Sequence, residues 1–313
     1  NSPRGQCIEA LINLTLRACR LEDRRTGGQH DAAWSHFKPY YEAELQRPAM
    51  REYEFATLVT NYLPNFLYMS KNWVIENLGR IFDQADHIKW LCAMNGYSYV
   101  NTVYEELYAH LKEEGHLLRA LDSDYLKERA EDRFVQHIAV AFLNDFENLT
   151  DKKSLIAALI ERADFDELSH LVWFVWTWRK DNDERVRGKV YELWPRLLKT
   201  TDLSSNEGQK LASALCHWAS FVDRIDDNKK ELLLTVAPYA HVSHNSYDLL
   251  KSLAQISDTQ PFEANEIWQE MLAGAAVDYP EDAIRRILAN LMSQGEAGKR
   301  AARGTVSAYL ERG

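Results

Sequence analysis

The sequence predicts an all-α protein, and three observations lead to this fold class. Amphipathic periodicity, with apolar residues three and four positions apart, runs through almost the whole chain. Glycine and proline number only 13 and 8 among 313 residues, roughly 4% and 3% against average usage of roughly 7% and 5%. Tight turns are therefore too few for a β-sandwich or barrel. The nearest candidate for a strand, residues 87–100, contains Gly96 and loses its alternation.

Residues 1–150 are expected to form an irregular helical region. Its first helix should begin with Ser2 as N-cap and Pro3 at the first helical position, and should end at the Gly-Gly pair 27–28. A second helix is expected to follow, with Pro39 as a candidate break. Further helices are expected at about 49–62, 64–83, 86–95, 101–121 and 123–146.

Residues 151–313 show a more regular pattern of amphipathic segments. The connectors between these segments are short and polar, and each offers Asp, Asn, Ser or Thr as an N-cap for the next helix. Taken in pairs, the first helices begin near residues 165, 206, 245 and 280, a period of about 40 residues. The helices are expected at about 151–163, 165–180, 184–200, 206–224, 228–240, 245–257, 262–278, 280–294 and 297–311.

This period and the paired helices resemble HEAT-type repeats, in which stacked helix pairs bury a continuous core. The resemblance implies a HEAT-like α-solenoid of helical repeats over 151–313, either as a second domain or as one array continuous with 1–150. The pattern is also similar to the helical regions that follow SIR2-like or NTPase domains in bacterial multidomain defence proteins. That resemblance implies a fragment of a larger intracellular protein, an interpretation that the first residues, Asn-Ser-Pro without a methionine, also favour.

Composition restricts the partners and the compartment. With 37 basic and 47 acidic residues the net charge is −10, which argues against wholesale nucleic-acid binding. The longest dense apolar run, 171–178, is far shorter than the roughly 20 residues of a membrane span, so no membrane partner is expected. No CxxC pair occurs among Cys7, Cys19, Cys92 and Cys216, so we expect buried thiols in a reducing cytoplasm.

The segment from Leu171 to Trp178 is the most unusual one, because it is apolar almost all round. The favoured interpretation is a central helix buried on both sides. The alternative is an aromatic anchor site for a protein partner, because Trp and Arg dominate binding hot spots. Its candidate residues are Trp173, Trp176, Trp178 and Arg179.

A second candidate is a basic patch near the C-terminus, because residues 280–313 contain six basic and four acidic residues. Solvated helix faces are the favoured interpretation, and docking of acidic protein or nucleic acid is the alternative. The patch comprises Arg285, Arg286, Lys299, Arg300 and Arg303, together with Arg312.

Enzyme motifs are few. Glu113-x-x-His116 and Glu167-x-x-His170 have the spacing that places two metal ligands on one helix face, and His241-x-x-His244 lies near an expected helix end. No phosphate-binding glycine loop or GxSxG turn is present. We therefore expect no catalytic site, no metal and no cofactor.

The expected function is a recognition scaffold that binds a protein or peptide partner, or other domains of its parent chain. Two alternatives remain open, a nucleic-acid-binding HEAT-like solenoid and an all-helical enzyme, with or without a metal ion.

Overall fold

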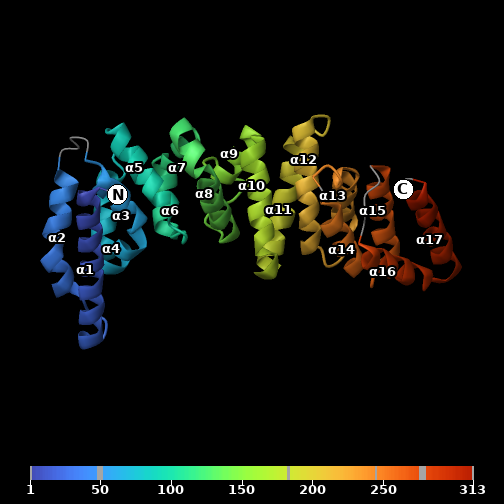
Figure 1. Ribbon diagram of the computed structural model, residues 1–313, viewed down its shortest axis with the longest axis horizontal. Helices are drawn as coiled ribbons and strands as arrows, with labels where there is room; N and C mark the ends of the chain where they lie inside the picture. The colour runs from blue at the N-terminus through green and yellow to red at the C-terminus, as the bar shows by residue number, and fades with distance from the viewer. Residues whose placement is uncertain (1, 48–51, 182–183, 244, 275–279, 312–313) are drawn as a thin grey trace. The chain divides into compact units, whose positions relative to one another are not determined.

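All regular structure in the described part of the protein is helical. The computed structural model describes residues 2–47, 52–181, 184–243, 245–274 and 280–311, and no strand occurs in these ranges (Figure 1). The predicted all-α fold class is confirmed. The chain divides into two compact units, Asn1–Ala141 and Phe142–Gly313. The domain boundary expected after residue 150 stays a prediction.

Expected and observed helices agree closely in the first unit. The Ser2 hydroxyl accepts a hydrogen bond from the backbone N–H of Gly5 at 3.0 Å, so the predicted N-cap is confirmed. Gly27 ends that helix in the left-handed conformation, with φ 77°. The helices are α1 (Pro3–Thr26), α2 (Asp31–Gln46), α3 (Glu54–Asn61), α4 (Leu63–Ile81), α5 (His87–Ser98), α6 (Glu105–Glu113), α7 (His116–Leu121) and α8 (Asp124–Leu143), the last of which runs past the unit boundary.

Two expectations for this unit are wrong. Helix α2 continues through Pro39, because Trp34 and Tyr41 on either side of the proline are buried in an aromatic core. That packing offsets the backbone hydrogen bond that a proline removes. The single helix expected over 101–121 is divided into α6 and α7, because Gly115 between them has φ 74°.

Helix α4 contains a break that its sequence does not indicate. Ser70 has extended backbone angles, φ −166° and ψ 95°, inside the helix. The His30 side chain lies at this break, with Nε2 3.1 Å from the carbonyl oxygens of Tyr68 and Met69. His30 Nδ1 lies 2.7 Å from a carboxylate oxygen of Asp23, so one imidazole links α1 to the broken helix.

The second unit is helical where helices were expected, but the segments expected at 165–180, 206–224 and 228–240 each end in a 3-10 helix. Side chains of Ser205 and Asp226 accept backbone N–H groups as N-caps, as predicted from the polar connectors, and Ser154 and Asp164 do the same at two further helices. The connector before Pro261 is an exception, since its N-cap Gln260 makes no such bond. The elements are α9 (Leu155–Arg162), α10 (Phe165–Thr177), η1 (Trp178–Asp181), α11 (Glu184–Thr200), α12 (Asn206–Leu215), η2 (Cys216–Phe221), α13 (Asp227–Val236), η3 (Ala237–Tyr239), α14 (Ser246–Ile256), α15 (Pro261–Ala273), α16 (Glu281–Met292) and α17 (Gly295–Leu310).

Alternate helices pack against one another within this unit. Helix α10 contacts α12, α14 contacts α16, and α9 contacts α11, while α15 packs against α13 and α17. Trp194, Trp218 and Trp268 are buried between these helices. Of the four thiols, Cys19 and Cys216 are buried, but Cys7 is exposed, so the expectation that all four are buried is wrong.

Candidate functional site

Helix α10 is firmly anchored at its start. The Asp164 carboxylate accepts the backbone N–H groups of Asp166 and Glu167, which caps the helix. The Glu167 carboxylate is fully buried and lies 3.1 Å from Nε of Arg162 on α9. A buried carboxylate of this kind needs a cationic partner, so this ion pair fixes the start of α10 against α9.

One face of α10 packs into the core of the second unit. Leu168, Leu171, Val172 and Val175 recur at helical spacing and are buried. The indole N–H of Trp218 donates to the Val172 carbonyl oxygen at 3.0 Å, so η2 closes on this face. Because Trp173 on this helix is 48% exposed, the favoured prediction of burial on both sides is wrong.

The tryptophans that the sequence singled out lie outside this buried row. Trp173 is 48% exposed, and Trp176 and Trp178 are half-buried. We call these three tryptophans, with Arg179, the α10 surface. Six of the nine tryptophans in the chain are buried, and the remaining three all belong to the α10 surface. The exposed area of tryptophan in the described residues is therefore concentrated in one segment.

Trp176 contacts two planar groups. The guanidinium carbon of Arg179 lies 3.7 Å from the centre of the indole ring, and the His217 ring lies 4.5 Å from it at an angle of 34°. Arg179 also donates to the Trp176 carbonyl oxygen at 3.3 Å. The cation–π contact and the ring contact together limit the rotation of this indole.

His217 extends the α10 surface to η2 and α14. Its Nδ1 lies 3.0 Å from a carboxylate oxygen of Asp248, within ion-pair distance but not aligned for a hydrogen bond. Burial lowers the pKa of His217 and outweighs the attraction of Asp248, so the imidazole is neutral near pH 7. The sequence carried no signal for either residue, because both come from other helices.

The basic patch is largely neutralised by neighbouring acids. Arg285 pairs with Glu281, Arg286 forms a two-pronged ion pair with Asp258, and Lys299 lies 2.9 Å from Glu296. Arg300 and Arg303 are exposed on α17, and Arg312 lies outside the described residues. The structure thus brings the predicted residues onto two adjacent helices without leaving a strongly positive surface.

Potential metal ligands have other roles. Glu167 pairs with Arg162, and His116 Nδ1 accepts the indole N–H of Trp90 at 2.9 Å. His244 lies outside the described residues, so the spacing from His241 is not observed. Within the described ranges, no group of three or more His, Cys, Asp or Glu side chains is placed to hold a metal ion. No helix in the part of the chain described is both long and apolar enough to span a bilayer.

The fold and this surface define an all-α protein with a localised, exposed aromatic face. Comparisons with protein-family models, curated proteins and solved structures found no match for the chain.

Proposed function

We propose that this chain is a protein-recognition scaffold and that the α10 surface binds a protein or peptide partner. The observation that carries the proposal is the division of the tryptophans, six in the core and three outside it within the single segment 173–178. Leaving large indoles in water costs free energy that burial against a partner recovers. Trp and Arg are also the residue types most enriched among binding hot spots.

The fixed position of Trp176 supports the same function. Arg179 and His217 hold its ring before any partner arrives, so binding loses less side-chain entropy at this position. Trp173, at 48% exposure, supplies the apolar contact area beside it. The carboxylate of Asp248 lies at the edge of the surface and offers a polar contact at its rim.

We further propose that the second unit is a HEAT-like helical-repeat array. The contacts of α10 with α12, of α14 with α16 and of α15 with α13 and α17 support it, since stacked helix pairs bring alternate helices together. Arrays of this kind commonly bind other proteins through a surface that spans several helices. The α10 surface has this character because its contacts reach η2 and α14.

The two alternatives have weaker support. A net charge of −10 and three ion-paired cations in the basic patch leave little positive charge for a phosphate backbone. For an enzyme, the Glu-x-x-His motifs would have to supply ligands, and Glu167 is occupied by Arg162.

A peptide library tests the proposal. Random-sequence peptides displayed on phage are selected on the immobilised wild-type protein, and the affinities of enriched peptides are measured for Trp173→Ala and Trp176→Ala. We expect both substitutions to weaken binding about tenfold or more, as for hot-spot residues. Phe262→Ala is the matched control, because Phe262 is 42% exposed on α15, outside the α10 surface. Its truncation should leave the affinity of the peptides unchanged. No enrichment, or enriched peptides that bind Trp173→Ala like wild type, would contradict the proposal.

A further inference from the structure

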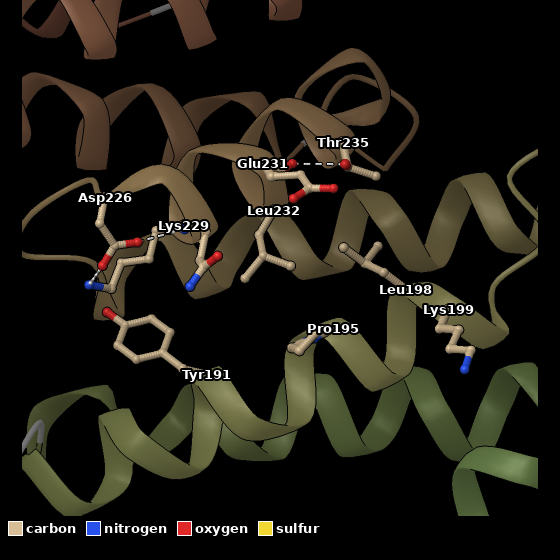
Figure 2. A pocket seen from close by; sticks show the side chains of 10 residues that line it. Tyr191, Pro195, Leu198, Lys199, Asp226, Lys229, Glu231, Leu232 and Thr235 are labelled. Atoms are coloured by element: carbon tan, nitrogen blue, oxygen red, sulfur yellow. Dashed lines mark hydrogen bonds and ion pairs between the residues drawn. The ribbon is translucent and has the colours of Figure 1, made fainter.

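A second surface of the same unit lies between α11 and α13. These helices enclose a groove of about 660 Å³, within the roughly 300–1,000 Å³ range of ligand pockets. Figure 2 shows Tyr191, Pro195 and Leu198 on the α11 wall, with Lys229 and Leu232 on the facing α13 wall. None of the α10 surface residues lines this groove.

The walls of the groove follow helical ridges. Tyr191, Pro195 and Leu198 stand at positions i, i+4 and i+7 of α11. Asn228, Leu232 and Thr235 have the same spacing on α13. Side chains at this spacing form rows along a helix, and the space between two such rows accepts a row from a third helix.

Pro195 adds a polar feature to the α11 wall. A proline has no backbone N–H, so the carbonyl oxygen of Tyr191 lacks the donor that an ordinary residue at 195 would supply. Both residues line the groove. A backbone carbonyl that has lost its usual donor is able to accept a hydrogen bond from a ligand.

The charges around the groove are arranged in two ways. At one end, Lys229 Nζ lies 2.6 Å from Asp226 and 4.9 Å from the centre of the Tyr191 ring (Figure 2). The charges of Lys229 and Asp226 are therefore already paired within the protein. Lys199 on α11 and Glu231 on α13 are exposed, and neither has an ion-pair partner among the described residues. A complementary ligand must therefore carry both an acidic and a basic group.

We infer that the groove between α11 and α13 binds an amphipathic helix of a partner protein. The apolar face of that helix, with side chains at i, i+4 and i+7, packs on Pro195, Leu198 and Leu232. An acidic residue of the helix pairs with Lys199, and a basic residue pairs with Glu231. A helix offers a row of side chains to each of the two walls, whereas a small molecule would leave much of this open groove empty.

Binding of synthetic peptides, measured by fluorescence anisotropy, tests the inference. The probe is a helical peptide with leucines at i, i+4 and i+7 and with flanking Asp and Arg residues, and a scrambled peptide of equal composition is its control. We expect saturable binding of the probe only, weakened about tenfold or more by Leu232→Lys. Leu234→Lys is the matched control, because Leu234 is also half-buried on α13 but lies off the groove.

Charge reversal gives an independent readout that does not disturb packing. Lys199→Glu should weaken binding of the probe. A peptide whose Asp is replaced by Lys should regain affinity for this variant. Trp173→Ala should leave probe binding unchanged, so failure here is distinguishable from failure of the α10 surface. Absence of binding, equal binding of the scrambled peptide, or binding insensitive to both Leu232→Lys and Lys199→Glu would overturn the inference.

Discussion

Two sets of tryptophans in the second unit have the same chemistry and opposite surroundings. Trp194 and Trp218 are buried and meet edge to face, with ring centres 5.8 Å apart. Trp173 and Trp176 lie on the outer side of α10, where one is about half exposed and the other is covered mainly by Arg179 and His217. The core tryptophans maintain the fold, whereas those of the α10 surface keep part of their area in contact with solvent.

The difference shows that hydrophobicity alone does not assign a residue to the core. The 171–178 segment is apolar almost all round, yet its fully buried residues are leucine and valine, and none of its tryptophans is buried. Large exposed apolar patches mark interaction sites in soluble proteins, and the function proposed for the α10 surface follows this rule. Each prediction below concerns a residue that belongs to, or contacts, either the buried tryptophans or those of the α10 surface.

The largest effect is expected from Trp218→Ala. This change removes a fully buried indole and its hydrogen bond to the Val172 carbonyl oxygen, and it leaves a cavity beside Trp194. We expect a loss of about 3–5 kcal/mol in unfolding free energy, measured by denaturant titration. A loss below about 1 kcal/mol would show that Trp218 is not part of the core.

A smaller loss of stability is expected in wild-type protein as the pH falls, and it involves Trp90, a buried tryptophan of the first unit. Its indole N–H donates to His116, whose pKa is lowered to about 4 by burial and by the nearby charges of His110 and Arg119. As the pH falls from about 6.5 to 4, the unfolded chain binds a proton that folded His116 resists. Stability should therefore decrease with acidification, by about 2 kcal/mol from this residue.

His116→Gln is the control for this pH dependence. An amide oxygen can accept the Trp90 N–H but does not titrate, so the variant should lose less stability than wild type between pH 6.5 and 4. Equal slopes of unfolding free energy against pH in both proteins would contradict the assignment to His116.

Arg179→Ala should have a modest effect on the α10 surface. It removes the guanidinium stacked on Trp176 and should cost about 0.5–1 kcal/mol in unfolding free energy. The loss of one covering group should also increase quenching of indole fluorescence by acrylamide. Unchanged stability and quenching would mean that the stack does not hold Trp176.

Much of the fold was predictable because helix signals are local. Ser2 and Gly27 mark the ends of α1, and periodicity places α10 and α11 within a few residues of their observed bounds. The break at Ser70 was not predictable, because its compensating contacts come from His30, distant in sequence.

The candidate site was predictable only in part. The sequence located Trp173, Trp176, Trp178 and Arg179, but their orientation depends on which face of α10 meets α12 and η2. His217 and Asp248 join the surface through tertiary packing, which leaves no local pattern. For the groove, the only local signal was a proline inside a helix, at Pro195.

Comparison of stability and binding in Trp173→Ala tests the central claim most directly. Because Trp173 is 48% exposed, its truncation should change the unfolding free energy by no more than about 0.5 kcal/mol. The same variant should bind the selected peptides about tenfold or more weakly than wild type. A variant that is strongly destabilised, or one that keeps both its stability and its affinity, would contradict the assignment of α10 as a binding surface.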